Sequence, residues 1–313
     1  MNRRKRVLIA PLDWGLGHAA RCIPIIREEL ALGNEVILAS NGRSAALLSR
    51  YFPSLKLLTD IPDYSIKYST RWSFALKMAL QLPKILSCIR REHAWVRRAH
   101  SQFQFEQIIS DNRYGVYLPN VHSVIITHQT APRVPRWSRA GVHGVIQYWL
   151  ERFDETWIPD YEDSAKSLAG ELSHENVPSN ARYIGPLSRF NGKIEAVRNY
   201  AKVAIISGPE PYRSVFQREV EQAFLKENEA TLILTGKPEE QESVFIQKVM
   251  TTSRMDDELL GAVLMGADEV FCRSGYTSIM DFHYLGLKNV RWVPTPGQTE
   301  QEYLFKRQEH RQI

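Results

Sequence analysis

The sequence predicts an α/β fold with two domains, each built on a parallel sheet that helices cover on both faces. Short apolar runs typical of buried strands alternate with segments of helical spacing along the whole chain. A length of 313 residues is typical of two domains rather than one. A polar break over 173–181 separates two alternating sets and predicts Rossmann-like domains at 1–185 and 186–313. We expect the two domains to face a cleft that holds a ligand.

The elements follow in order along the chain. The first domain opens with an apolar strand over 7–12, a Gly-rich turn, and a helix over 19–30, which together form half of a βαβ unit. Its further strands are expected at 36–40, 56–58, 107–110, 123–127 and 155–159, and its helices at 43–48, 71–100 (interrupted by Pro83) and 144–152. In the second domain, strands are expected at 203–206, 231–234, 269–272 and 290–293, and a helix at 257–265.

The turn after the first strand carries a candidate functional histidine. Gly15 and Gly17 allow a tight turn and the close approach of another group. His18 stands at or just before the helix N-terminus, at the carboxyl end of the sheet, where open α/β sheets bind ligands. It is either a cap for that helix or a catalytic group. The turn fits the dinucleotide fingerprint only partly, because Ala20 replaces the third glycine.

Composition excludes several classes of protein. The three cysteines are widely separated, which argues against a disulfide framework or a cysteine zinc site and favours a reducing compartment. No apolar run reaches the roughly 20 residues of a membrane span, and we expect no signal peptide. These observations favour a cytoplasmic protein.

Charge divides unevenly between the two halves. Residues 1–150 hold 21 Lys and Arg against 9 Asp and Glu, a net of +12, whereas residues 151–313 hold 19 against 26, a net of −7. The basic half favours an anionic partner such as a membrane surface or a phosphorylated lipid, and no nucleic-acid motif is present. The segment 71–98 mixes apolar and basic residues. It either lies on an anionic bilayer or packs on its own domain, with Trp95 in the core.

Three polar loops follow strands of the second domain and therefore share the carboxyl edge of its sheet. The N–H groups of a Ser-Gly turn at 274–275 can hold a phosphate, and Asp281, two turns into the next helix, can accept ribose hydroxyls. Alternatively, the three loops are ordinary surface turns that bind no ligand. The candidate residues on these loops are Ser207, Gly208, Arg213, Arg273, Ser274, Gly275, Asp281, Gln298, Gln301 and Glu302.

These motifs resemble the GT-B glycosyltransferases, specifically the family 28-like branch of the peptidoglycan GlcNAc transferase that makes lipid II. The resemblance covers nearly the whole chain. It rests on Gly15-Leu16-Gly17-His18, on Ser207-Gly208-Pro209 against the donor diphosphate, on Ser274-Gly275 through Asp281, and on Gln298 through Glu302 against the donor sugar. The chain departs from the family at Pro209 and Glu210, and at Glu302, where the family has a second glutamine. Family members also continue past the position of Ile313, so we expect a short carboxyl-terminal end.

The resemblance implies inverting, metal-independent transfer of a sugar, such as a UDP-linked N-acetylhexosamine, without a cofactor. The acceptor would be lipid-linked or another glycan, and the enzyme would be cytoplasmic, with a place at the inner face of the membrane. His18 would remove the acceptor proton, and Asp111 would orient His18 or act as the base itself; alternatively, Asp111 only forms a turn. Arg213 or Arg273 and the loop N–H groups would meet the diphosphate charge. A nucleotide-sugar 2-epimerase and a non-catalytic nucleotide-sugar-binding subunit remain alternatives.

Overall fold

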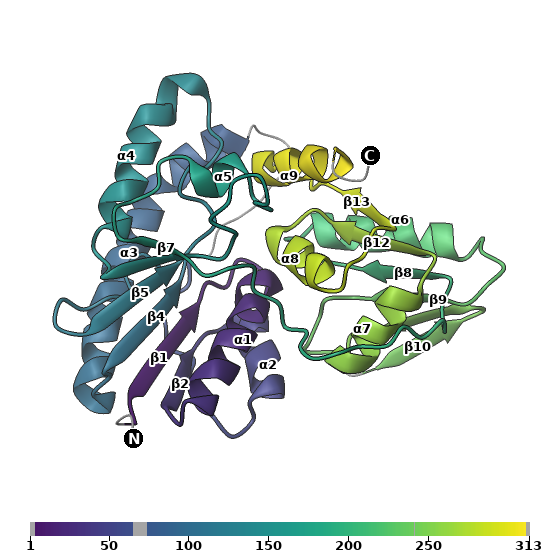
Figure 1. Cartoon of the computed structure of the whole chain (residues 1–313), viewed down its shortest axis with the longest axis horizontal. Helices are drawn as coiled ribbons and strands as arrows, with labels where there is room; N and C mark the ends of the chain where they lie inside the picture. Colours follow the sequence, from purple (N-terminus) through teal and green to yellow (C-terminus); the bar gives the residue numbers. More distant parts are fainter. Residues whose placement is uncertain (1–3, 65–73, 241, 311–313) are drawn as a thin grey trace. The chain divides into compact units, whose positions relative to one another are not determined.

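The chain forms two compact units, and the main division lies between Leu187 and Ser188. The computed structural model describes residues 4–64, 74–240 and 242–310. Each unit contains one twisted, mainly parallel sheet with helices packed on it, so the predicted α/β class of two Rossmann-like domains is confirmed (Figure 1).

The sheet of the amino-terminal unit has seven parallel strands in the order β3-β2-β1-β4-β5-β6-β7. The order reverses between β1 and β4, which are paired directly. Such a reversal creates the position where open α/β sheets bind ligands. The strands are β1 (Arg6–Pro11), β2 (Glu35–Ala39), β3 (Lys56–Leu58), β4 (Gln107–Asp111), β5 (His122–Ile126), β6 (Glu155–Ile158) and β7 (Ala181–Tyr183).

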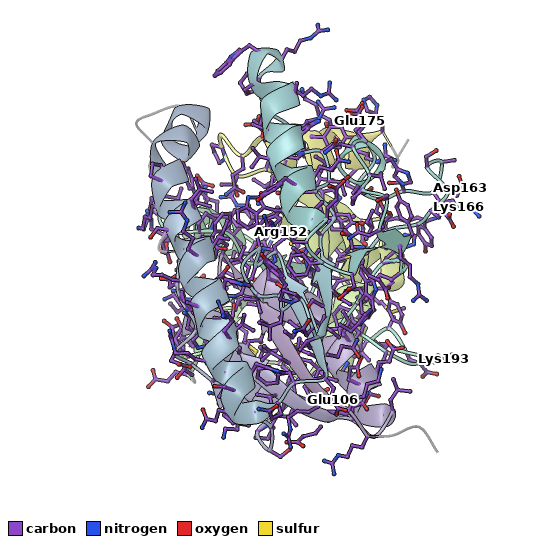
Figure 2. All side chains as sticks on the ribbon, turned by 90° about the vertical axis from the view of Figure 1, so that its left-hand side faces the viewer. Glu106, Arg152, Asp163, Lys166, Glu175 and Lys193 are labelled. Atoms are coloured by element: carbon purple, nitrogen blue, oxygen red, sulfur yellow. The ribbon has the colours of Figure 1, made fainter. Side chains whose placement is uncertain are left out.

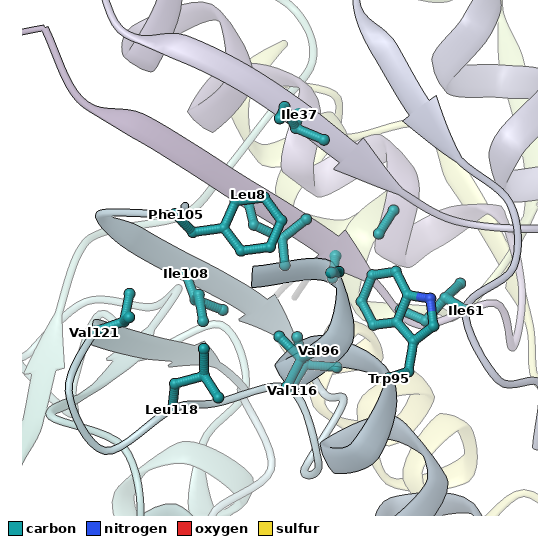
Figure 3. Close-up of a cluster of buried hydrophobic side chains, with 13 residues drawn as sticks. Leu8, Ile37, Ile61, Trp95, Val96, Phe105, Ile108, Val116, Leu118 and Val121 are labelled. Carbon is teal, nitrogen blue, oxygen red and sulfur yellow. The ribbon is translucent and has the colours of Figure 1, made fainter. Parts of the chain in front are cut away.

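Helices cover both faces of this first sheet (Figure 1). They are α1 (Leu16–Ala31), α2 (Gly42–Tyr51), α3 (Phe74–Phe103), α4 (Arg139–Leu150) and the short α5 (Glu171–His174), with a 3₁₀ turn η1 (Arg136–Ser138) before α4. The α3 face of the sheet forms a continuous core, in which Trp95 and Val96 pack against Leu8 of β1 and Ile108 of β4 (Figure 3). Successive residues of a strand point to opposite faces of the sheet. The buried side chains of Val7 and Ile9 therefore lie on the other face, the one on the side of α1.

The carboxyl-terminal unit has a six-stranded sheet in the order β10-β11-β9-β8-β12-β13, parallel except for β10. Its order reverses between the paired strands β8 and β12. Helix α6 packs on the sheet through Phe216, Val220 and Phe224. The strands are β8 (Lys202–Ile205), β9 (Thr231–Leu234), β10 (Ser243–Ile246), β11 (Val249–Thr252), β12 (Glu269–Arg273) and β13 (Val290–Val293), and the helices are α6 (Tyr212–Phe224), α7 (Asp257–Gly266), α8 (Tyr276–Tyr284) and α9 (Thr299–Glu309).

The expected strands are all present, each end within one residue of its predicted place. The helix predictions were less exact: α1 begins at Leu16 instead of 19 and α2 ends at Tyr51 instead of 48. Helix α3 continues through Pro83 without interruption, because a proline removes only one hydrogen bond of a 30-residue helix. Helix α4 begins at Arg139 instead of 144. The edge strands β7 and β10, the inner strand β11 and the helices α5 and α6 were not predicted.

The basic segment 71–98 is described only in part. Residues 71–73 and the side chains of 74–82 lie outside the described residues. In the described part, Trp95 is buried in the core, whereas Arg90, Arg91, Arg97 and Arg98 are exposed. This part therefore packs on its own unit. No helix within the described ranges is long and apolar enough to cross a bilayer.

Candidate functional site

The first sheet brings two predicted residues together at its reversal point. His18 lies in the first turn of α1, just after β1, and Asp111 is the last residue of β4. The strands pair in register from Val7 with Gln107 to Pro11 with Asp111, so their carboxyl ends lie side by side. Gly15, with φ of +144°, has a backbone conformation that side chains rarely adopt, and it turns the chain from β1 into α1. Gly17 lies in the first turn of α1, directly before His18.

The two side chains are hydrogen-bonded. Nδ1 of His18 lies 2.9 Å from Oδ1 of Asp111. The Asp111 side chain is fully buried, whereas that of His18 remains 18% exposed. Because the histidine bonds through Nδ1, its Nε2 is the nitrogen available for chemistry when Nδ1 carries the proton. The turn after β4 is made by Asn112, whose φ is +54°, and not by the Asp111 carboxylate.

Two residues that the sequence analysis did not single out complete this cluster. Arg21 donates from Nε to Oδ2 of Asp111 at 2.5 Å and from a second nitrogen to Oδ1. Its remaining nitrogen lies 3.1 Å from Nδ1 of His128, which follows β5. Both residues are buried. Both residues could have been predicted from their positions in the sequence. Arg21 follows His18 by one helical turn and therefore lies on the same helix face, and His128 follows the carboxyl end of a strand.

The charges of the cluster are set by burial and by close contacts. Burial, assisted by the Arg21 cation, lowers the pKa of His18 below its ordinary value of 6.5, although the Asp111 carboxylate opposes this. Burial alone would raise the pKa of Asp111, but Arg21 and His18 outweigh it and hold that pKa well below its usual range. At neutral pH the cluster therefore contains an ionised Asp111 and a neutral His18.

The second sheet assembles three loops at its own reversal point. Ser207 and Gly208 follow β8, Ser274 and Gly275 follow β12, and the turn 294–298 follows β13. A Cβ placed on Gly208, whose φ is +105°, would lie 3.6 Å from Oγ1 of Thr295, so the first and third loops lie close together. The Ser274 hydroxyl donates to the carbonyl of Gln301 at 2.8 Å and joins the second loop to α9.

The end of β12 leads into a helix N-terminus. Gly275 is the N-cap residue of α8, and a Cβ built on it would meet no described atom within 4 Å. The backbone therefore stands open to a ligand at this point. The first N–H groups of a helix have no partner within the helix, and together with the positive end of the helix dipole they favour an anion there.

The two candidate arginines are buried beneath these loops and bound within the unit. Arg213 donates to Glu210 at 2.6 Å and to the carbonyl of Thr235 at 3.0 Å. Arg273 donates to the carbonyls of Pro294 at 2.8 Å and Tyr212 at 3.2 Å. Each guanidinium thus connects loops at the carboxyl edge of the sheet and contributes a positive charge below them.

Asp281 contacts the start of the unit. The Ser188 hydroxyl donates to Oδ1 of Asp281 at 2.7 Å, and Nε of Arg189 lies 3.4 Å from Oδ2. The side chain is almost fully buried, and burial raises the pKa of this carboxyl, although Arg189 and Ser188 oppose the shift. In this arrangement the carboxylate fastens α8 to residues 188–189.

The Gln-rich segment forms the start of α9 and shapes the turn before it. Gln298 is the N-cap residue of α9, and its N–H donates to the carbonyl of Thr295 at 3.1 Å. The Gln301 side-chain oxygen accepts the N–H of Thr295 at 2.9 Å, and the Glu302 carboxylate accepts the N–H of Gly297 at 3.0 Å. The Gln301 and Glu302 side chains therefore provide hydrogen-bond partners for two backbone N–H groups of the turn.

Within the described residues, no group of three or more His, Cys, Asp or Glu side chains is arranged to hold a metal ion. The three cysteines are buried and free. Burial raises the pKa of Cys272 to about 12, so its thiol stays protonated.

Comparisons with known proteins agree on the fold. No protein-family model and no curated protein sequence matches the chain. Among solved structures, the chain is similar to a spinosyn rhamnosyltransferase complexed with thymidine diphosphate, with a TM-score of 0.62, 15% identity, and coverage of 98% of this chain and 84% of that one. The glycotransferase of kitacinnamycin matches with a TM-score of 0.61, 16% identity and the same coverage. MurG of Acinetobacter baumannii matches with a TM-score of 0.50 and 12% identity over 96% of this chain and 82% of that one. The two-sheet α/β fold of this chain is the GT-B fold of glycosyltransferases.

Proposed function

We propose that the protein is a glycosyltransferase that moves a sugar from a nucleotide diphosphate sugar to an acceptor hydroxyl. The observation that carries this proposal is the hydrogen bond between His18 and Asp111 at the reversal point of the first sheet. The fold supports it, because the similar solved structures are glycosyltransferases and one of them binds thymidine diphosphate. We further propose an inverting hexosyltransferase whose donor is UDP-linked, such as a UDP-N-acetylhexosamine.

In the proposed reaction His18 is the base. The proposal places the ring proton on Nδ1, which donates to Asp111, so that Nε2 holds a lone pair and accepts the proton of the acceptor hydroxyl. The acceptor oxygen then attacks the anomeric carbon and the nucleoside diphosphate leaves from the opposite side, which inverts the configuration at that carbon. Asp111 has no exposed surface and bonds to both Arg21 and His18, which supports an orienting role instead of direct contact with the acceptor.

The donor is assigned to the carboxyl-terminal unit. We propose that its diphosphate binds the N–H groups near Ser207, Gly208, Ser274 and Gly275, with the positive end of α8 beneath it. Buried Arg213 and Arg273 add positive charge below the same loops and hold them in place. In this proposal, these groups stabilise the leaving diphosphate without a metal ion.

The ribose and the sugar are assigned to neighbouring residues of the same edge. We propose that Asp281 accepts ribose hydroxyls and that Gln298, Gln301 and Glu302 line the sugar position. For Asp281 this requires an exchange of partners, because Ser188 and Arg189 bind its carboxylate in the structure. Glu302 carries a carboxylate where the family that the sequence resembles has a second glutamine. In this proposal, that difference alters which sugar the site accepts.

The acceptor side is proposed to contact an anionic membrane surface, which suits a lipid-linked acceptor. The net charge of +12 over residues 1–150 supports this. So do three exposed apolar side chains on η1 and α4: Trp137 is 88% exposed, Val145 50% and Tyr148 54%. Helix α4 and the neighbouring Arg152 face the viewer in Figure 2, and the Arg152 guanidinium lies 4.4 Å from the Tyr148 ring centre.

Vesicle sedimentation tests the membrane contact. Anionic vesicles should bind the protein better than neutral ones, and salt should weaken the binding because charges are screened over about 8–10 Å. Trp137→Ser should reduce binding, whereas Phe245→Ser, which removes another exposed aromatic ring (68% exposed) from the other unit, should not. Equal binding to both kinds of vesicle would favour a water-soluble acceptor.

The transferase itself is tested in two steps. A panel of nucleotide sugars in a thermal-shift assay identifies the donor, because a ligand that binds only the folded state raises its stability. Release of nucleoside diphosphate is then measured with and without candidate acceptors. Release that depends on an acceptor supports a transferase. An epimerase converts the nucleotide sugar without an acceptor, and a binding subunit releases no nucleoside diphosphate under either condition.

A further inference from the structure

Arg21 connects the members of the proposed base to a second histidine. Its guanidinium is 2% exposed and contacts three side chains from different elements: His18 on α1, Asp111 at the end of β4, and His128 after β5. The contact between Arg21 and Asp111 is bidentate, which fixes the orientation of both groups. Arg21 is therefore not a solvated surface arginine.

The proton positions follow from the donors present. An arginine side chain only donates, so Nδ1 of His128 accepts from Arg21 and the ring N–H of His128 lies on Nε2. Nδ1 of His18 lies 2.9 Å from both Oδ1 of Asp111 and a nitrogen of Arg21. It either donates to Asp111, which leaves Nε2 able to accept a proton, or accepts from Arg21, which places the proton on Nε2.

The charge balance decides which state of His18 is stable. A buried carboxylate beside a histidine favours the imidazolium form, because the ion pair is then neutral as a whole. Here Arg21 already neutralises Asp111, and a second buried cation on His18 would be uncompensated. The other groups near the cluster are Cys22, His128 and Tyr114, and none of them carries a negative charge at neutral pH.

We propose that Arg21 is a positioning residue that keeps Asp111 ionised and His18 neutral, so that His18 can accept a proton. The inference rests on the proposed function only in the last step, the use of His18 as a base. The protonation states themselves belong to the free protein and can be measured without any substrate.

The test measures the titration of His18 in the full chain by NMR with nitrogen-labelled histidine, in the wild type and in three Arg21 variants. Arg21→Met and Arg21→Gln remove the charge, and the Gln side chain still donates to Asp111, which protects the fold. Arg21→Lys keeps the charge. Arg27→Met removes a half-buried arginine of the same helix that contacts the Tyr51 ring, and serves as the matched control.

In Arg21→Met and Arg21→Gln the pKa of His18 should rise relative to the wild type, because the Arg21 cation no longer opposes the imidazolium form, whereas in Arg21→Lys and Arg27→Met it should stay close to the wild-type pKa. With an active donor and acceptor pair, the acid limb of the pH–rate profile should move by the same amount, and one pH unit of displacement means about tenfold less turnover on that limb. Activity should return at high pH with KM unchanged.

An unchanged His18 titration in folded Arg21→Gln would overturn the inference, as would a loss of turnover that is equal at every pH. A shifted titration in a protein that transfers no sugar would uphold the role of Arg21 and reject the glycosyltransferase proposal. The two failures are therefore distinguishable.

Discussion

Nδ1 of His18 lies 2.9 Å from Oδ1 of Asp111, although 93 residues separate the two in the chain. The parallel pairing of β1 with β4 produces this contact, because it places the residues that follow one strand beside the end of the other. The histidine is partly exposed and the aspartate is fully buried. A base that reaches solvent and an orienting group beneath it are the expected parts of a proton-transfer pair.

His18→Ala should reduce turnover by about 10²–10⁴-fold, because the reaction loses its base. Donor affinity, measured by calorimetry, should barely change, since the donor is assigned to the other unit. His122→Ala removes a half-exposed histidine bound to Glu155 and should leave turnover intact. If His18 is only a helix cap, the protein should instead lose about 1 kcal/mol of stability and keep its turnover.

Asp111→Asn should lower turnover about as much as His18→Ala. The amide cannot hold the Nδ1 proton of His18 as a carboxylate does, and Arg21 loses its counter-ion. If the two residues act as a unit, the double variant His18→Ala/Asp111→Asn should be no slower than either single variant. Losses that multiply would show that the residues act independently.

Turnover should fall in acid with a midpoint below 6.5, because burial and Arg21 lower the pKa of His18 from that value. Stability should change in the same window. The unfolded chain binds a proton on His18 at a higher pH than the folded chain does, so stability falls as pH drops through about 6.5. Urea unfolding of the wild type and of His18→Ala between pH 5 and 7 checks this. A pH dependence as steep in the variant as in the wild type would exclude a contribution from His18.

Asp281→Ala should weaken donor binding by roughly 1.5–3 kcal/mol, the loss of a charge-assisted hydrogen bond to the ribose. The same substitution also removes the partner of Ser188 and Arg189, so the control must separate the two effects. Ser188→Ala removes the hydrogen bond to Asp281 and the one accepted from the N–H of Phe190, but keeps the Asp281 carboxylate, and should leave donor affinity unchanged in calorimetry. Equal affinities in the wild type and Asp281→Ala would reject the ribose assignment.

Arg113→Met should lower the free energy of unfolding by about 3–5 kcal/mol, because it leaves the buried Glu92 carboxylate without its cation. Both side chains are almost completely buried, and Arg113 also donates to the carbonyls of Pro11 and Pro62. The double variant Glu92→Met/Arg113→Met should lose less than the sum of the two single variants, which urea unfolding can measure. Strict additivity would mean that the pair is not coupled.

The sequence by itself determined the order and type of most elements. Strands and helices differ in the spacing of their apolar residues, and this spacing is a local property that can be recognised in the sequence. Each expected strand lies within one residue of its predicted position. It also placed His18, Asp111 and the loops after β8, β12 and β13 at strand ends. Short edge strands such as β7 and the exposed β10 carry little periodic signal, and they were missed for that reason.

Only the tertiary structure decided which side chains meet. The pairing of β1 with β4 is a choice of sheet order, and it brings Arg21 and His128 to the two predicted residues. The same holds for Asp281, which contacts Ser188, and for Ser274, whose hydroxyl donates to the carbonyl of Gln301. Hydrogen bonds between groups far apart in the chain depend on three-dimensional packing, and no local spacing in the sequence specifies them.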